Sequence, residues 1–270
     1  VISIKKKANI IKGFSNSFDT CGTGGDGSKT FNISTISAIV TAACSVCVAK
    51  HGNKAVSSLT GSADVLSELG VNINIDNKTV IKCLKELNLC FLFAPNFHPI
   101  LKNVTDIRKK IGKRTIFNIL GPLLNPVECK KQIIGVYDVN LLIKVAEVLK
   151  KLGTEFAWVV SGNKEYDELT TTGKNYIAEI KNNTIKEFEI DSNEFGLKKS
   201  KKEDLIGGDS KKNAEIIKGI LESNLLGAKK DIVLLNSASA LYINGKTKDI
   251  KNGLEIVNET IESGKALKKL

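Results

Sequence analysis

A glycine-rich stretch at positions 19–35 (DTCGTGGDGSKTFNIST) carries the clearest chemical signal in the sequence. It contains four glycines among small polar residues, Gly22, Gly24, Gly25 and Gly27. An apolar run at 36–47 follows directly, and Ser34 or Thr35 is expected to be the N-cap of a helix. Glycine lets a ligand approach the main chain closely. A helix N-terminus adds free N–H groups and a positive dipole end, so the stretch suits a phosphate.

Two common phosphate motifs resemble this stretch without matching it. The GxGxxG spacing from Gly22 fits the dinucleotide fingerprint, but that motif needs an acid about twenty positions on, and positions 28–63 contain no Asp or Glu. The P-loop pattern is missed by one residue, because Ser28 precedes Lys29. Asp26 would repel a phosphate unless a metal or a sugar hydroxyl engages it. A purely structural glycine turn stays open on this stretch alone.

Two further polar loops are expected at the same edge of the predicted sheet. Positions 50–58 (KHGNKAVSS) follow a strand, and Lys50 offers a positive charge while Asn53 offers a donor and an acceptor. The adjacent carboxylates of Asp167 and Glu168 also follow a strand, where they can hold Mg²⁺ that bridges to phosphates. Ligands of open α/β sheets bind beyond the carboxyl ends of the strands, so the three loops together predict a phosphate site. Taken singly, each of the last two is better explained as an ordinary surface loop.

Alternating strands and helices place these loops in an α/β fold. Short apolar runs predict strands, and positions with helical spacing predict helices. The predicted strands are 17–21, 47–50, 90–94, 132–137 and 156–160, with a hairpin at 175–189; the predicted helices are 36–46, 61–70, 76–87, 141–152, 213–223, 229–242 and 250–262. This order predicts a mostly parallel central sheet with helices on both faces.

Composition narrows the class of protein. The chain has 270 residues and a net charge of +11, which comes mainly from lysines spread along its length. Such lysines normally solvate helices and loops, so the charge alone does not predict binding to nucleic acid or a membrane. The sequence has no run of about 18 apolar residues and no signal-peptide pattern, so we expect a soluble, cytoplasmic protein.

The cysteines and histidines favour packing over chemistry. Six cysteines are scattered through mostly apolar segments, as expected for reduced, buried side chains. Cys44, Cys47 and His51 have zinc-like spacing, but no second pair of ligands follows at a suitable distance. His51 and His98 are interpreted as structural, because neither has an acid nearby in the sequence to orient it as a base.

With these motifs in hand, the sequence closely resembles the anthranilate phosphoribosyltransferase family. The matching stretches occur in the family's order and cover the chain from about position 18. They are 21–26 (CGTGGD), 32–35 (NIST), 50–53 (KHGN), 61–66 (GSADVL), 91–95 (FLFAP), 114–122 (RTIFNILGP), 167–169 (DEL) and 264–266 (GKA).

The resemblance implies the α/β fold of the nucleoside phosphorylase and phosphoribosyltransferase catalytic domains. The implied enzyme transfers the phosphoribosyl group of 5-phosphoribosyl 1-pyrophosphate (PRPP) to the amine of anthranilate and releases pyrophosphate, a step of tryptophan biosynthesis. The resemblance also implies two Mg²⁺ ions per active site and a homodimer, with no nucleic-acid or membrane partner.

The resemblance assigns roles to individual residues. Gly22, Asn53 and Arg108 match positions that receive anthranilate, and Ser34, Asp167 and Glu168 match ligands of Mg²⁺. The residues assigned to PRPP are Gly22, Gly25, Asp26, Thr30, Asn32, Ile33, Ser34, Thr35, Lys50, His51, Gly52, Asn53, Lys54, Ala55, Val56, Ser57, Ser58 and Ser62.

Two features depart from the family pattern. The family begins with a small helical domain that also forms the dimer interface, and residues 1–15 are expected to be its remnant ahead of an α/β domain at 16–270. The loop at 161–166 lacks the histidine that is usual before Gly162, which affects the expected metal geometry at Asp167.

Two other functions are set against the transferase. A pyrimidine nucleoside phosphorylase shares this fold and also works at C1 of a ribose, and phosphorolysis of thymidine or uridine would reveal it. A non-catalytic nucleic-acid-binding relative would show binding with a steep salt dependence. Asn53, Arg108 and the Asp167–Glu168 pair favour the transferase.

Overall fold

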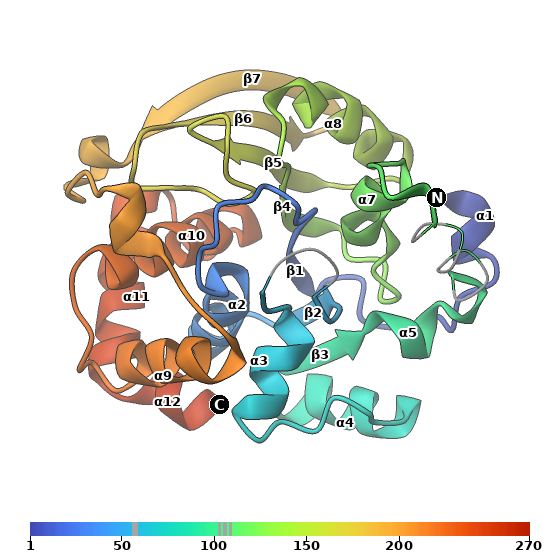
Figure 1. Ribbon diagram of the computed structural model, residues 1–270, viewed down its shortest axis with the longest axis horizontal. Helices are drawn as coiled ribbons and strands as arrows, with labels where there is room; N and C mark the ends of the chain where they lie inside the picture. Colours follow the sequence, from blue (N-terminus) through green and yellow to red (C-terminus); the bar gives the residue numbers. More distant parts are fainter. Residues whose placement is uncertain (56–58, 102–103, 105–106, 108–109) are drawn as a thin grey trace.

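The computed structural model describes residues 1–55, 59–101, 104, 107 and 110–270. Within these residues, seven strands form one sheet in the order β3-β2-β1-β4-β5-β6-β7 (Figure 1). The neighbours among β1–β5 pair in parallel, whereas β6 and β7 are antiparallel. The strands are β1 Phe18–Gly22, β2 Val48–Gly52, β3 Leu89–Phe93, β4 Lys131–Gly135, β5 Phe156–Gly162, β6 Lys174–Lys181 and β7 Thr184–Asp191.

Helices cover both faces of this sheet. Ile133, Trp158 and Ile177 share one apolar cluster with α2, α9, α10 and α11, whereas Ile134 and Val159 share another with α8 on the opposite face. Neighbouring residues of one strand therefore pack against different helices, which confirms the predicted fold class. The helices are α1 Ile2–Lys5, α2 Ile33–Ala43, α3 Ser62–Glu68, α4 Asn77–Glu86, α5 Ala94–Phe97, α7 Phe117–Leu120, α8 Leu142–Lys151, α9 Ser210–Leu221, α10 Ala228–Asn244, α11 Ile250–Glu262 and α12 Lys265–Lys269.

Local sequence rules explain several element ends. The Asp76 side chain caps α4 by accepting a hydrogen bond from Thr79 N at 2.8 Å. The turn between β6 and β7 uses Asn182 and Asn183, whose φ angles are 50° and 59°. Positive φ at both central residues is what a two-residue hairpin turn requires, and asparagine tolerates it. The predicted hairpin is confirmed.

The start of α2 was predicted wrongly. Its N-cap is Asn32, not Ser34 or Thr35, and Asn32 makes no side-chain cap bond. The Asn32 amide is instead tied to other segments, since its Nδ2 donates to Thr60 O at 3.2 Å and its Oδ1 accepts from Asn213. Long-range contacts thus override the local capping preference and place Ser34 inside the first helical turn.

The first fifteen residues pack against the α/β unit. They contain the short helix α1, and backbone bonds join Asn9 N to Phe97 O and Ile11 N to Pro126 O. Ile11 is buried in the cluster beside β2 and β3. The segment therefore shares the core of the sheet.

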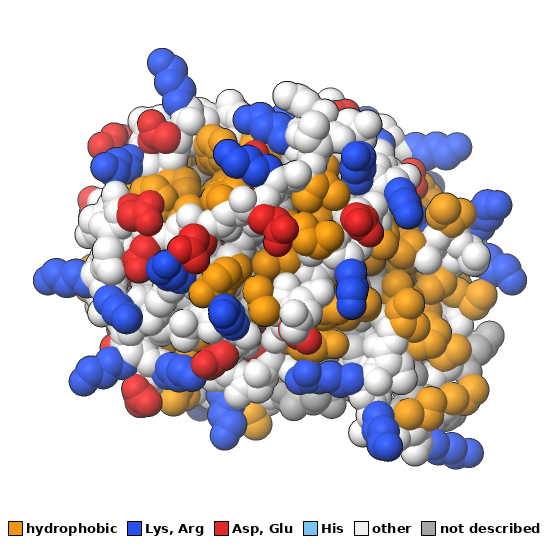
Figure 2. All heavy atoms as spheres, turned by 90° about the horizontal axis from the view of Figure 1, so that it is seen from above, with side chains coloured by type: hydrophobic (Ala, Val, Ile, Leu, Met, Phe, Trp, Pro, Cys, Tyr) orange, Lys and Arg blue, Asp and Glu red, His pale blue; other side chains and the backbone are white. Residues whose placement is uncertain are grey.

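The surface and the helices bear on two earlier expectations. Figure 2 shows lysine and arginine side chains interspersed with acidic ones over the face in view, without one continuous basic patch. Among the residues described, no helix combines the length and apolar character that crossing a membrane requires.

Candidate active site

Three loops meet at the carboxyl edge of the sheet. The glycine loop (residues 23–32) joins β1 to α2, the β2–α3 loop (residues 53–61) follows β2, and the acidic loop (residues 163–173) follows β5. In the sheet, β1 lies between β2 and β4, and β4 lies beside β5. These three strands end at one edge of a parallel sheet, where ligands bind in such folds.

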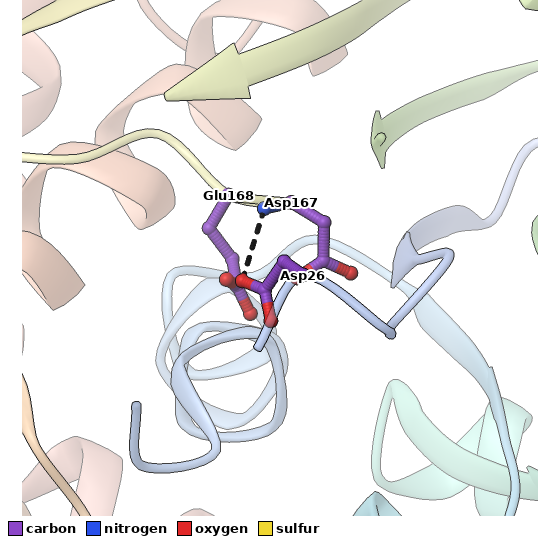
Figure 3. A group of neighbouring side chains, drawn as sticks. All are labelled: Asp26, Asp167 and Glu168. Carbon is purple, nitrogen blue, oxygen red and sulfur yellow. Dashed lines mark hydrogen bonds between the residues drawn. The ribbon is translucent and has the colours of Figure 1, made fainter. Parts of the chain in front are cut away.

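A cluster of three carboxylates joins the glycine loop to the acidic loop. One carboxylate oxygen from each of Asp26, Asp167 and Glu168 lies within 4.8 Å of the others (Figure 3). Gly24 N donates a hydrogen bond to Asp167 Oδ2 at 2.6 Å, and Asp167 N lies 3.5 Å from Asp26 Oδ2. Residues about 140 positions apart in sequence therefore form one site. The sequence pointed to Asp167 and Glu168 as a pair and did not place Asp26 with them.

The electrostatics of this cluster suit a divalent cation. Burial, reinforced by the charge of Asp26, raises the pKa of Asp167 from 3.8 to about 7. Burial, reinforced by the charge of Asp167, raises the pKa of Glu168 above its usual 4.5. Glu168 Oε2 is buried and has no hydrogen-bond partner within the described residues. Mg²⁺ prefers carboxylate oxygens, and its charge would offset their repulsion, so the donor set fits this ion.

Glycines leave the space that Asp167 occupies. A Cβ on Gly22 would overlap Asp167 Oδ2, and a Cβ on Gly135 would overlap the Asp167 carbonyl oxygen. Gly22 and Gly135 pair across β1 and β4, so both strand ends lie under the acidic loop. Close backbone approach is a known reason for glycine in a strand. Gly135 was not predicted from sequence, because a glycine at a strand end gives no sign of what approaches it.

Lys50 lies beneath the first turn of α2. It is 3 % exposed, and its Nζ donates to Thr20 O at 2.5 Å and Ser34 Oγ at 3.3 Å. Its positive charge favours the charged forms of Glu168 and Asp19, so it acts against the pKa elevation of both. Lys50 therefore braces Ser34 and offsets buried negative charge.

Comparison with known proteins agrees with this geometry. Residues 15–267 match the family model described as the glycosyl transferase family, a/b domain. The chain is 51% identical to anthranilate phosphoribosyltransferase of Clostridium kluyveri over 93% of its own length and 75% of that protein. It belongs to the anthranilate phosphoribosyltransferase family.

Solved structures from the family superpose closely on this chain. The Thermus thermophilus enzyme gives a TM-score of 0.93 at 36% identity, covering 99% of this chain and 80% of that one. The Saccharomyces cerevisiae enzyme in complex with PRPP and Mg gives 0.92 at 31% identity, with coverage of 99% and 76%. The same enzyme in complex with 4-fluoroanthranilate gives 0.90 at 29%, with coverage of 99% and 75%.

Two side chains assigned to PRPP by the family resemblance point away from the three loops. Ile33 is fully buried in the apolar cluster under α2. His51 is 2 % exposed, its Nδ1 lies 3.1 Å from Gly121 O, and its ring stacks edge-on against His98 with centroids 5.2 Å apart. Burial and the neighbouring His98 lower the pKa of His51 to about 3. Adjacent strand residues face opposite ways, so Lys50 and His51 cannot both face α2.

A pair of asparagines, Asn32 and the buried Asn213, connects the glycine loop to the start of α9. Asn213 Nδ2 donates to Asn32 Oδ1 at 3.0 Å, and Asn213 Oδ1 accepts from Gly208 N at 2.7 Å. Thr60 Oγ1 donates to Gly208 O at 3.0 Å. Gly207 N also donates to Lys29 O at 2.9 Å. The segment before α9 therefore holds the glycine loop in place, a role the sequence did not suggest.

Other assigned residues lie in or beside the β2–α3 loop, and four assigned residues lie outside the described residues. Asp64 Oδ2 accepts hydrogen bonds from Ala55 N and Gly61 N, both at 2.9 Å, and so joins these two residues of the loop. Ser62 Oγ accepts from Thr35 Oγ1 at 3.1 Å, which joins it to α2. Lys54 N donates to the Asn53 side chain. Outside the described residues lie Val56, Ser57, Ser58 and Arg108.

Arg114 lies over the glycine loop. Its guanidinium donates to Gly25 O and lies 4.1 Å from the centre of the Tyr137 ring. Tyr137 N lies 3.3 Å from Thr23 Oγ1, so the segment after β4 contacts both Arg114 and the glycine loop. Arginine combines a planar donor fork with stacking on an aromatic ring. In sequence Arg114 appeared only as part of a family motif.

A cavity of larger volume lies away from the three loops. About 390 Å³ in volume, it is lined near the beginnings of β4 and β5 by Lys130, Gln132 and Thr154. A second, much smaller cavity lies among Ser34, Asp167 and Glu168. The side chains around them decide which of the two cavities is the candidate site, because Asp167 and Glu168, the end of β1 and the first turn of α2 all line the smaller one.

Proposed function

We propose that this chain transfers the phosphoribosyl group of PRPP to the amine of anthranilate and releases pyrophosphate. The observation that carries the proposal is the carboxylate cluster of Asp26, Asp167 and Glu168 facing a glycine loop that leads into a helix. Relatives solved with PRPP and Mg and with 4-fluoroanthranilate support this choice of substrates. The reaction is a step of tryptophan biosynthesis.

The donor site is assigned to the glycine loop, the α2 start and the β2–α3 loop. Backbone N–H groups at a glycine loop and a helix N-terminus favour pyrophosphate oxygens. We retain those assigned residues whose groups adjoin these loops and omit the Ile33 and His51 side chains, which face the core. The retained residues are Gly22, Gly25, Asp26, Thr30, Asn32, Ser34, Thr35, Lys50, Gly52, Asn53, Lys54, Ala55 and Ser62, with Val56, Ser57 and Ser58 carried forward from sequence alone.

Two Mg²⁺ ions are assigned to each site. Asp167 and Glu168, joined by Asp26, would hold one, and Ser34 on the first turn of α2 would hold the other. When bound, Mg²⁺ neutralises negative charge on the departing pyrophosphate. The buried Lys50 positions the Ser34 hydroxyl, to which its Nζ donates.

The acceptor needs positioning more than activation. An aromatic amine is neutral at pH 7, so no strong base has to remove its proton before attack. His51 and His98 are consistent with a reaction that needs no strong base, because both are buried with lowered pKa values and lie away from the loops. Asn53 and Arg108 are assigned to anthranilate, with the planar Arg108 fork matched to its carboxylate. Catalysis then rests on orientation and charge stabilisation.

We assign the protein to the cytoplasm as a homodimer without nucleic-acid or membrane partners. On the face that Figure 2 shows, lysine and arginine are interspersed with acidic side chains, whereas nucleic-acid surfaces concentrate positive charge, so this face supports the assignment. A salt-dependent gel-shift titration tests this assignment, and tight binding that weakens steeply with salt would contradict it.

The function is tested by following the loss of anthranilate fluorescence with PRPP and Mg²⁺. We expect turnover that stops when EDTA removes the metal. Thymidine and uridine with phosphate serve as the competing assay. Phosphorolysis of either nucleoside without turnover of anthranilate would replace the proposed function with that of a nucleoside phosphorylase.

A further inference from the structure

A side chain of α10 holds the backbone of the acidic loop. Asn236 Oδ1 accepts from Leu169 N at 3.2 Å, and Asn236 Nδ2 donates to Leu169 O at 2.8 Å. The same Nδ2 donates to Ile232 O, one helical turn earlier, at 2.8 Å. Asn236 is 5 % exposed and Leu169 is fully buried. One amide thus satisfies both backbone groups of the residue that follows Glu168.

A second asparagine treats the next residue in the same way. Asn175 Oδ1 accepts from Thr170 N at 2.6 Å, and Asn175 Nδ2 donates to Thr170 O at 2.9 Å. Thr170 and Asn175 are both fully buried. Leu169 and Thr170 lie outside any strand, so without these amides their buried polar groups would lack sheet partners. The two side-chain amides supply the hydrogen bonds that a neighbouring strand would otherwise provide.

Only one of the two asparagines adjoins the carboxylate cluster. Asn236 lines the small cavity together with Ser34, Ser37, Asp167 and Glu168, whereas Asn175 does not. In that cavity Ser37 Oγ and Glu168 Oε2 are buried polar atoms without hydrogen-bond partners in the described part of the chain. Asn236 therefore holds the loop backbone and also lies beside the oxygens that would bind a cation.

Asn236 also links the two assigned metal positions. It belongs to α10, which packs against α2 in the main apolar cluster. Ser34 lies in the first turn of α2, and Leu169 follows the acidic pair. A residue anchored in the α10–α2 pair sets how far the acidic loop stands from that turn.

We propose that Asn236 is a positioning residue for the metal site: its amide fixes Leu169 and thereby aims Asp167 and Glu168 at a divalent cation. This inference rests on the proposed function, which assigns the cation to these carboxylates. Asn236 itself touches neither metal nor substrate in this account. Partners that orient metal ligands in this way typically contribute about 10–100-fold to metal affinity.

The test compares Asn236→Leu with Asn175→Leu. Each change removes one amide of similar size from a buried site and leaves one pair of backbone groups unsatisfied, so both variants should lose stability. The readout is Mn²⁺ affinity, measured by electron paramagnetic resonance of the full chain, alone and with saturating pyrophosphate. We expect the dissociation constant to rise about 10–100-fold for Asn236→Leu and less than threefold for Asn175→Leu.

The outcomes separate this inference from the proposed function. Equal losses of Mn²⁺ affinity in both variants would make Asn236 a general structural residue and overturn the inference. Unchanged affinity in Asn236→Leu would do the same. If the wild-type chain bound no Mn²⁺ under either condition, the metal assignment would fail first and the inference with it.

Hydrogen exchange keeps the inference testable if the leucine variants do not fold. In the wild-type chain the Leu169 amide should exchange slowly, because Asn236 Oδ1 accepts its proton, and Mn²⁺ with pyrophosphate should slow it further. Rapid exchange at Leu169, or a rate indifferent to Mn²⁺ binding, would overturn the proposal. Asn236→Ala supplies a smaller change for the same affinity measurement, with the same expected direction.

Discussion

The glycine loop and the acidic loop meet at one site but are built in opposite ways. In the glycine loop, Gly24, Gly25 and Gly27 have φ angles of 66°, 76° and 75°, and a Cβ on any of them would meet nothing within 4 Å. In the acidic loop, Leu169 and Thr170 are fully buried and clamped by asparagines. The glycine loop has open space around its glycines, whereas the backbone of the acidic loop is held by buried side chains.

The difference matches what each loop is proposed to contact. A flexible polyphosphate is held by main-chain N–H groups, which an open glycine loop can bring to it. A divalent cation requires oxygens at set positions, and a rigid buried loop supplies them. Burying these carboxylates in their charged form costs free energy, as the raised pKa of Asp167 shows, and a bound cation would offset that cost.

The largest effect should come from filling the space under the acidic loop. Gly135→Ala places a methyl group against the Asp167 carbonyl, whose buried backbone cannot move freely. We expect kcat/KM to fall about 100-fold or more, as displacements of about 1 Å do elsewhere. The control is Gly27→Ala in the open loop, whose positive φ costs about 1–2 kcal/mol of stability. A smaller fall in kcat/KM for Gly135→Ala than for Gly27→Ala would contradict the proposed contrast between the two loops.

The next effect concerns the contact that restrains the glycine loop. Arg114→Ala removes the donor to Gly25 O and the stack on Tyr137, so we expect the KM for PRPP to rise about tenfold. Arg114→Lys keeps the charge but loses the planar fork, and should restore little. Steady-state kinetics with each substrate varied gives the answer. Full recovery in the lysine variant would show that charge alone matters there.

The pH dependence of the free energy of unfolding tests two buried residues beneath the loops, His51 and Asp19. His51 has a pKa of about 3 in the folded chain against its usual 6.5, so below pH 6.5 the unfolded chain binds a proton that the folded chain refuses. Its contribution to stability is therefore full above pH 6.5 and is lost as the pH falls toward 3. Asp19 acts the other way, since its raised pKa of about 6 favours folding as the pH falls from 6 to 3.8.

His51→Gln isolates the first of these two contributions. Between pH 7 and pH 4, the free energy of unfolding measured with denaturant should fall less steeply for the variant than for the wild type. Parallel slopes would show that His51 does not titrate on unfolding. The control is Asp76→Asn, a distant helix cap, which should leave the difference between pH 7 and pH 5 nearly unchanged.

The smallest effect is expected at the exposed ion pair beside the acidic loop. Lys202 pairs with Glu165, and both side chains are about half exposed, at 54% and 49%. Exposed pairs often contribute nothing measurable. Lys202→Ala should therefore leave Mg²⁺ dependence and thermal stability unchanged. A clear rise in the Mg²⁺ requirement would mean that the acidic loop is held at its surface as well as from within.

The same contrast explains what the sequence could predict. The glycine loop, the strands and the β6–β7 turn depend on residues close together in the chain, so their patterns were legible. Asn236 acts on Leu169 from 67 positions away, and nothing near Asn236 in the sequence indicates that partner. The role of Gly135 could not be predicted for the same reason, because the residue that approaches it, Asp167, is distant in sequence. The N-cap of α2 was wrong because Asn213, 181 positions from Asn32, engages its amide.

The central claim is tested most directly by a crystal of this chain soaked with PRPP and Mn²⁺, with diffraction recorded at the manganese edge. The account predicts an anomalous peak within coordination distance of Asp167 or Glu168, with pyrophosphate oxygens over the glycine loop. A second peak is expected beside Ser34. Bound PRPP with no peak at the carboxylate cluster would contradict the account.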